Sequence, residues 1–199
     1  MFISFEGIDG SGKSTQARHL AETLRQSGRE VVLTREPGGS EGAEEIRRLL
    51  VEGGGERWSP ETELLLFMAA RRDHVERMIG PALARGEIVI SDRFADSSRV
   101  YQGLARAENR QLVEELHRLV IGIEPQITFV IDINPETSLA RGKSRGGTED
   151  RYESLGLEFQ QRLRAGFLAL SREFPERIRV IDGSGSEDEV ARRVLAALP

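Results

Sequence analysis

The feature that most constrains the fold is a glycine-rich stretch near the start of the chain, EGIDGSGKST at residues 6–15. It follows an apolar run, FISF at 2–5, and precedes apolar residues at helical spacing within 13–27. We therefore expect a buried strand, a loop and a helix in succession. Glycines allow such a loop to curl with its N–H groups turned inward, where a Cβ would obstruct both the curl and the approach of an anion. The helix that follows adds a partial positive charge at the same place.

The spacing Gly7-x-x-x-x-Gly12-Lys13-Ser14 matches the P-loop pattern in full, in the strand-to-helix context that the pattern requires. The lysine is expected to bridge the terminal phosphates of a nucleoside triphosphate, and the serine hydroxyl to bind Mg²⁺. The alternative is a glycine-rich turn that only connects two elements. The residues expected to contact ATP in this loop are Gly7, Ile8, Asp9, Gly10, Ser11, Gly12, Lys13, Ser14 and Thr15.

Beyond this loop, apolar runs alternate with amphipathic segments. Continuous apolar strands joined by helices are typical of a parallel sheet with helices on both faces. The sequence therefore predicts an α/β chain with the P-loop NTPase fold, a five-stranded parallel sheet and one domain over 1–199. The further strands are expected at 31–34, 87–91, 126–133 and 177–182, and the further helices at 41–51, 60–79, 96–104, 108–121, from 134, at 153–173 and at 187–198.

Charged residues stand where these strands end. Right-handed crossovers bring the carboxyl ends of parallel strands to one edge, so Glu6, Arg35, Asp92 and Asp132 are expected along it. Asp92 is predicted to hold Mg²⁺ directly or through water, with helix capping as the alternative. Arginines near this edge, among them Arg35, Arg71, Arg72 and Arg93, suit bidentate binding of a phosphate, although surface positions are the alternative, above all for Arg72.

Composition excludes several classes of protein. A net charge of −5 argues against a nucleic-acid partner, and the absence of cysteine excludes disulfides and thiol chemistry. No apolar run is long enough to span a membrane and no secretory signal begins the chain, so we expect a cytoplasmic protein. The lysines are Lys13 and Lys143, which makes the guanine-reading Asn-Lys-x-Asp of switch GTPases impossible. The histidines His19, His74 and His117 are expected at the surface or in ordinary packing.

Five stretches together resemble the bacterial thymidylate kinase family: GIDGSGKST, TREPGG at 34–39, FMAAR at 67–71, DRFADSSRVYQG at 92–103 and DRYE at 150–153. They occur in the family's order over nearly the whole chain. The resemblance implies phosphorylation of dTMP to dTDP by ATP with Mg²⁺, by a homodimer. The alternatives are another nucleoside monophosphate kinase of the same fold and a P-loop nucleotide-binding protein without catalysis.

The resemblance also assigns residues to the acceptor nucleotide. Phe67 would stack on thymine, or else belong to the core, and Arg71 on the same helical face would donate to a base carbonyl. Tyr101 would exclude a ribose 2′-hydroxyl. The full set expected to bind dTMP is Asp9, Arg35, Phe67, Arg71, Arg93, Ser97, Ser98, Tyr101 and Gln102.

A polar, glycine-rich loop is expected to act as a lid over about 142–150. Some family members carry a catalytic arginine directly after the P-loop acid, where this chain has Gly10. The resemblance therefore places the charge in the lid, on Arg145, with Lys143 and Arg151 as alternatives, and it places Arg141 against adenine. The expected catalytic residues are Lys13, Arg93 and Arg145.

Overall fold

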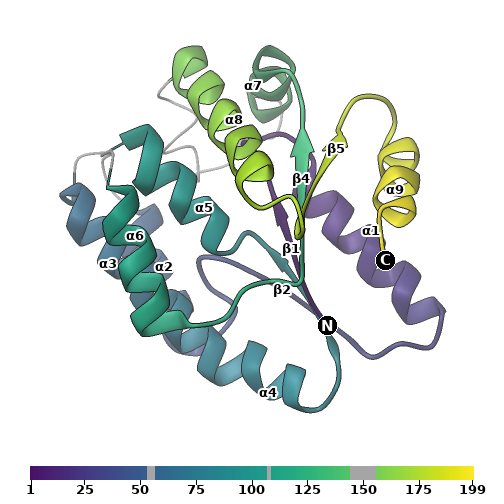
Figure 1. Ribbon diagram of the computed structural model, residues 1–199, viewed down its shortest axis with the longest axis horizontal. Helices are drawn as coiled ribbons and strands as arrows, with labels where there is room; N and C mark the ends of the chain where they lie inside the picture. Colours follow the sequence, from purple (N-terminus) through teal and green to yellow (C-terminus); the bar gives the residue numbers. More distant parts are fainter. Residues whose placement is uncertain (53–56, 107–108, 144–155) are drawn as a thin grey trace.

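The computed structural model describes residues 1–52, 57–106, 109–143 and 156–199. Its centre is a five-stranded sheet in the order β2-β3-β1-β4-β5, with every pair of neighbours parallel (Figure 1). This confirms the predicted α/β architecture and all five strands. The strands are β1 Phe2–Glu6, β2 Val31–Arg35, β3 Ile88–Asp92, β4 Ile127–Asp132 and β5 Ile178–Asp182.

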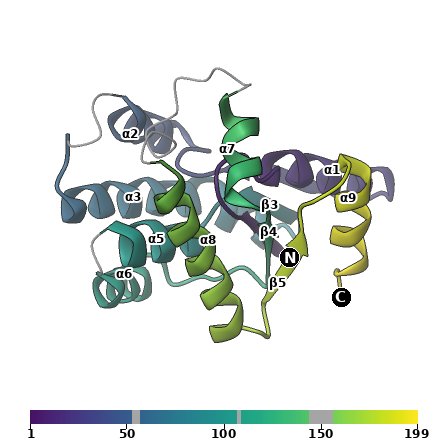
Figure 2. The same cartoon turned by 90° about the horizontal axis from the view of Figure 1, so that it is seen from above.

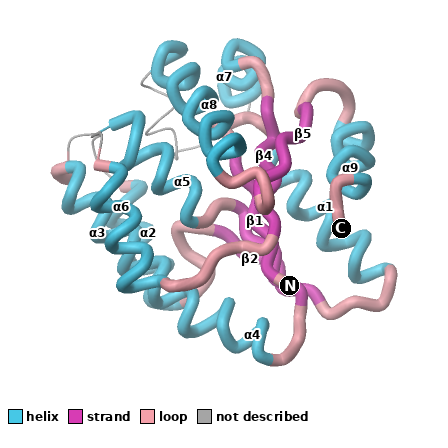
Figure 3. The backbone as a smooth tube through the Cα atoms, in the orientation of Figure 1, coloured by secondary structure: helices cyan, strands magenta, loops and turns pink. Residues whose placement is uncertain are grey.

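Helices cover both faces of the sheet (Figures 2 and 3). Alternate residues of β1 face opposite ways, with Ile3 and Phe5 packing on α1 and α9 and Phe2 packing on α3, η1 and α6. The described helices are α1 Lys13–Gln26, α2 Glu41–Val51, α3 Pro60–His74, η1 Val75–Ile79, α4 Gly80–Ala84, α5 Ala95–Val100, η2 Tyr101–Arg106, α6 Arg110–Leu116, η3 His117–Ile121, α7 Pro135–Lys143, α8 Gly156–Glu173 and α9 Glu187–Ala196. Within the described ranges, no helix is both long enough and apolar enough to cross a membrane.

The strand register brings three loops to one point. Phe5 pairs with Asp92, and Asp92 pairs with Arg35, so β1, β3 and β2 end at the same level. Beyond the ladder, Arg93 N donates to Phe5 O at 2.9 Å and Glu36 N donates to Asp92 O at 2.9 Å. The P-loop, the DRF stretch and the REPGG turn therefore leave the sheet side by side, as the crossover argument predicted.

Most predicted boundaries lie within a few residues of those in the structure, and the largest difference is at Ile79. The helix expected to end at Ile79 continues without a break through Ala84. A wider π-helical turn at Val75–Ile79 leads into Gly80-Pro81. Proline is tolerated there because it lies in the first turn of α4, where its missing N–H group needs no partner. Residues 142 and 143, which were predicted to open the lid, instead belong to α7, because this helix extends through Lys143. The rest of the expected lid, 144–150, lies outside the described residues.

Candidate active site

The P-loop connects β1 to α1 by a backbone that only glycine tolerates at two places. Gly7 has φ 138°, and a Cβ there would lie 2.7 Å from the carbonyl oxygen of Ile131. Gly10 has φ 83°, and a Cβ there would collide with the backbone of Ser138 in α7. The first turn of α1 contains no acidic residue, so its N–H groups face no competing carboxylate of their own helix. This geometry suits an anion at the start of α1.

The close packing at Gly10 also explains why this position carries glycine and not the arginine that the resemblance allowed. An arginine after the P-loop acid would need space that the Ser138 backbone occupies. The Ser138 hydroxyl additionally donates to the carbonyl oxygen of Asp9, which fastens α7 to the loop. The tight packing therefore leaves no room for a side chain at this position of the loop.

Lys13 is turned back onto the P-loop. Lys13 is 7% exposed. Its Nζ lies 3.3 Å from Asp9 Oδ1 and 3.5 Å from the carbonyl oxygen of Ile8. Burial and the neighbouring Arg93 lower the pKa of Lys13, against the opposing effect of Asp9 and Asp92. Lys13 is thus a buried cation whose charge Asp9 balances in this structure.

Arg93 joins the P-loop to α5 and η2. Its Nη2 contacts Asp9 and lies 3.2 Å from the Tyr101 hydroxyl, while its Nη1 donates to Ser97 Oγ at 3.0 Å. The guanidinium also lies over the Tyr101 ring, 5.1 Å from its centroid. Burial would raise the pKa of Asp9, but Arg93 and Lys13 hold it well below its usual range. The structure thus brings together five residues that were predicted separately.

Glu6 lies buried beneath this cluster. Its carboxylate accepts from Phe94 N at 2.8 Å, from Ser97 N at 3.1 Å and from Ser97 Oγ at 2.6 Å, and so fixes the turn between β3 and α5. Burial and the nearby Asp96 raise the pKa of Glu6 to about 7, against the effect of Arg93. The sequence placed Glu6 at the sheet edge without a function. The sequence signal that could have indicated a function for Glu6 is its position as the last residue of an apolar strand.

A second group of predicted residues lies where α3 faces α5 and η2. Arg71 is 2% exposed and donates from Nε to Glu36 Oε2 at 2.6 Å and from Nη2 to Phe94 O at 3.0 Å. Phe67, one turn earlier on α3, is half-buried. Gln102 donates to Glu63 of α3 at 3.0 Å. Ser98 is buried, and its hydroxyl has no hydrogen-bond partner in the described part of the chain.

Other predicted residues stand apart from both groups. Arg35 is exposed and pairs with Glu44 of α2 at 3.3 Å, and Arg141 is exposed on α7. Lys143 ends α7, whereas Arg145 and Arg151 lie outside the described residues.

Arg47 of α2 was missed by the sequence analysis. It is 9% exposed and donates to the carbonyl oxygen of Pro37 at 2.6 Å, so it holds the turn that follows β2. In the sequence it is one of two adjacent arginines on an amphipathic helix, which gives no signal of burial.

The residues predicted to hold Mg²⁺ fit a hard cation. Asp92 ends β3, and its Oδ1 is buried without a hydrogen-bond partner among the residues that the structure describes. Its charge acts on Lys13, which places the carboxylate beside the P-loop. Ser14 supplies a half-buried hydroxyl in the first turn of α1. Oxygen donors of this kind, few in number and close to bound phosphate, are those that Mg²⁺ takes in nucleotide sites.

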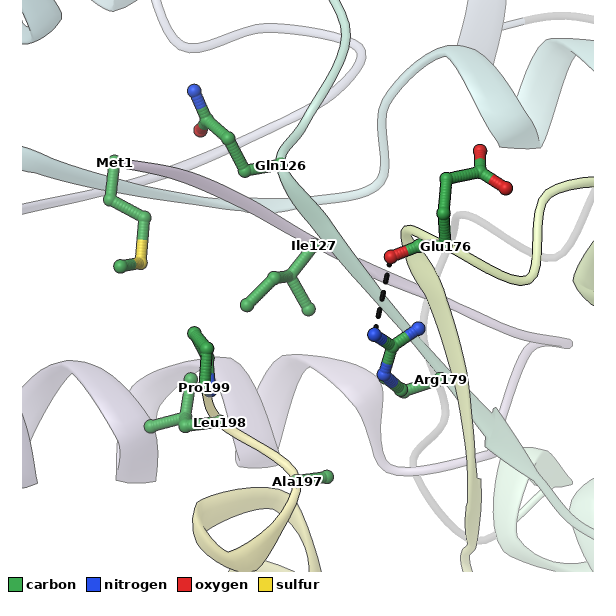
Figure 4. Close-up of a pocket in the computed structure, with 8 residues that line it drawn as sticks. All are labelled: Met1, Gln126, Ile127, Glu176, Arg179, Ala197, Leu198 and Pro199. Carbon is green, nitrogen blue, oxygen red and sulfur yellow. Dashed lines mark hydrogen bonds between the residues drawn. The ribbon is translucent and has the colours of Figure 1, made fainter.

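A separate cavity of about 590 Å³ lies at the amino end of β4, whereas the residues described above lie at the carboxyl ends of the strands (Figure 4). Its cation Arg179 already donates to the carbonyl oxygens of Pro175 and Glu176. None of the predicted site residues lines this cavity. Its lining residues are Met1, Gln126, Ile127, Glu176, Arg179, Ala197, Leu198 and Pro199.

Comparison with known proteins agrees with this arrangement. The family model described as thymidylate kinase matches residues 5–194. The thymidylate kinase of Dinoroseobacter shibae is 67% identical over 196 residues, covering 98% of this chain and 95% of that protein. The thymidylate kinase of Ruegeria pomeroyi is 64% identical over 194 residues, covering 98% of this chain and 92% of that protein.

A solved structure extends the agreement to the fold. The crystal structure of thymidylate kinase from Ehrlichia chaffeensis superimposes with a TM-score of 0.83 at 37% sequence identity, covering 100% of this chain and 98% of that one. One assignment follows from the P-loop, from the cluster of Arg93 and Tyr101 beside it, and from the similarity to thymidylate kinases over nearly the full length of the chain. The chain belongs to the thymidylate kinase family.

Proposed function

We propose that this chain transfers the γ-phosphoryl group of ATP to dTMP, giving ADP and dTDP, in the cytoplasm and as a homodimer. The observation that carries the proposal is the position of Arg93, which contacts Asp9 of the P-loop on one side and Ser97 and Tyr101 on the other. A guanidinium between a triphosphate loop and a second polar wall suits an acceptor phosphate that must lie in line with the donor.

On the donor side, the P-loop from Gly7 to Thr15 would hold the phosphates through its backbone N–H groups. Lys13 would release Asp9 and turn toward the β- and γ-phosphates. Arg141 would lie against adenine. Arg145 would neutralise the equatorial oxygens of the transferred group, with Lys143 and Arg151 as the alternatives.

Ser14 and Asp92 would hold Mg²⁺, which when bound neutralises charge on the phosphate oxygens and orients them. The partnerless buried Oδ1 of Asp92 supports this assignment. The α1 N-terminus acts on the same phosphates.

On the acceptor side, Arg93 and Arg35 would bind the phosphate of dTMP. Arg35 would exchange its exposed partner Glu44 for that phosphate, since its contact of 3.3 Å lies at the surface and is weak. Phe67 would stack on the base and Arg71 would donate to it. Tyr101, already held by Arg93 and Asp9, would press on the sugar with Ser97, Ser98 and Gln102 nearby.

A coupled assay of ADP formation tests the proposal. With ATP and Mg²⁺, we expect ADP to form on addition of dTMP, more slowly with dUMP and far more slowly with CMP, AMP or GMP. Another preferred acceptor would indicate a related monophosphate kinase. ATP binding without acceptor-dependent ADP formation would indicate a nucleotide-binding protein and would overturn the proposal.

A further inference from the structure

His74 is the most deeply buried histidine of the chain, and the proposed chemistry makes no use of it. It ends α3, its side chain is 0% exposed, and both ring nitrogens have partners. Nδ1 lies 3.1 Å from Glu36 Oε1, and Nε2 lies 2.7 Å from Thr34 Oγ1. A carboxylate only accepts hydrogen bonds, so Nδ1 carries a proton and donates it to Glu36.

Glu36 connects this histidine to Arg71. One carboxylate oxygen accepts from His74 and the other accepts from Arg71 Nε at 2.6 Å, so the carboxylate is held at both ends. Although burial alone would raise the pKa of Glu36, Arg71 and His74 hold it below its usual value. The carboxylate is therefore ionised at neutral pH and keeps the guanidinium in one orientation.

That orientation determines which nitrogen of Arg71 can meet a ligand. Nε is bound to Glu36 and Nη2 donates to Phe94 O at 3.0 Å. Nη1 has a weak contact with Met68 Sδ at 3.9 Å among the described residues. Nη1 is thus the donor that stays available to a base, and without Glu36 the guanidinium would rotate about its last bonds.

The REPGG turn is built closely against the same histidine. Gly39, with φ 90°, lies so near that a Cβ would collide with His74 Nε2 and Thr34 Oγ1. Its N–H donates to Glu44 at 2.9 Å. The turn, the strand β2 and the end of α3 therefore form one packed unit around His74, and a change at this ring has little room to be absorbed.

We propose that His74 is a positioning residue for base selection: through Glu36 it orients Arg71 toward a pyrimidine carbonyl and so disfavours a pyrimidine that has an amino group there. The inference rests on the proposed function. An N–H donor of fixed direction pairs with a carbonyl, whereas an amino group leaves both partners unpaired, and sites of this type discriminate strongly. A loosely held guanidinium would discriminate less.

Kinetics with two acceptors tests this inference. The acceptors are dTMP and 5-methyldeoxycytidine monophosphate, which keeps the methyl group and exchanges one carbonyl for an amino group. The quantity compared is kcat/KM for dTMP divided by kcat/KM for 5-methyldeoxycytidine monophosphate. In His74→Leu we expect this ratio to fall about tenfold because the KM for dTMP rises, while the KM for ATP stays unchanged. Thr34→Val should lower the ratio in the same direction by a smaller factor.

Two further variants separate positioning from stability. His74→Asn keeps an N–H group near the position of Nδ1 and should restore most of the ratio. His117→Leu makes the same substitution at the other well-buried histidine, which pairs with Glu124 at 3.0 Å, and should leave the ratio unchanged. If His74→Leu and Thr34→Val melt earlier yet keep the wild-type ratio, the inference is wrong. If the wild type itself fails to phosphorylate dTMP, the proposed function fails instead.

Discussion

Arg93, which contacts Asp9 of the P-loop as well as Ser97 and Tyr101, has an unusual backbone conformation. Its φ of 72° is the one positive value among the described residues other than glycine. Such a conformation costs roughly 1–3 kcal/mol and persists only where surrounding contacts hold it in place. Here Arg93 N donates to Phe5 O at 2.9 Å and Ser91 Oγ donates to Arg93 O at 2.7 Å. The strained backbone aims the guanidinium back over the P-loop.

Arg93→Lys should remove most of the activity. Lysine keeps the charge but cannot reach Ser97 and Asp9 at the same time, so we expect kcat/KM for dTMP to fall at least about 100-fold. Steady-state kinetics measure the change. Arg85→Lys is the control, because Arg85 is exposed and pairs with Glu87 at the start of β3. Equal activity in the two variants would contradict the assignment of Arg93.

At the scale of elements, α5 is held in place from below by a buried charge cluster. Asp96 is 1% exposed and accepts from Arg177 Nη1 at 2.6 Å and from Arg99 Nη1 at 2.9 Å, and Thr128 Oγ1 of β4 donates to it at 3.2 Å. A helix of six residues has little stability of its own. The cluster therefore fixes the element that carries Ser97 into the site.

Asp96→Asn should destabilise the whole fold. It removes one of the two carboxylates that Arg99 and Arg177 share, Glu124 being the other, and we expect the free energy of unfolding to fall by about 3 kcal/mol. Urea denaturation measures this value. Glu173→Gln at the surface, where Glu173 pairs with Arg110 at 2.9 Å, should change it by less than about 1 kcal/mol. A similar small change in both variants would count against a stabilising cluster.

The positions of the helices and strands were more predictable from the sequence than the side-chain contacts between them. The central strands β1, β3 and β4 follow from apolar runs because they are buried along almost their whole length. The edge strands β2 and β5 are partly exposed, and their apolar residues were still enough to predict them. The prediction that a helix ends at Ile79 was wrong. Gly80-Pro81 is typical of a helix break, but a π-helical turn lets the helix continue past these residues.

The site was predicted unevenly for a related reason. The P-loop is a local pattern, so its position follows from a short stretch of sequence. The burial of Arg71 and its bond to Glu36 depend on how α3 packs beside the turn after β2, and no pattern in either stretch specifies that contact. His74 was expected at the surface or in ordinary packing, because no sequence pattern shows its contacts with Glu36 and Thr34.

At the scale of the whole molecule, buried carboxylates give the fold opposing responses to pH. The pKa values of Glu36 and Asp96 are lowered, since their arginine partners outweigh burial. Their contribution to stability is present above the ordinary carboxyl pKa of about 4 and is lost as pH falls through the lowered values. Glu6 behaves in the opposite way. Its pKa is raised from 4.5 to about 7, so its contribution is present below 4.5 and is lost as pH rises through about 7.

A comparison with Glu6→Gln measures this second effect. Between about pH 5 and pH 8 the wild type should lose stability that the variant does not lose, because glutamine stays neutral beside Asp96 at every pH in this range. Thermal melting at a series of pH values gives both curves. Parallel curves across this range would contradict the raised pKa of Glu6.

Asp9 is shared between Lys13 and Arg93, one cation from each of the two proposed nucleotide sites. A ligand that draws either cation toward itself would change how firmly the carboxylate holds the other, so in the proposed site donor and acceptor would be energetically linked through one oxygen, Asp9 Oδ1. Linkage of this kind is reciprocal: whatever factor the first nucleotide imposes on the affinity for the second, the second imposes on the first. The order in which the two arrive then alters the route to the ternary complex and leaves its free energy unchanged.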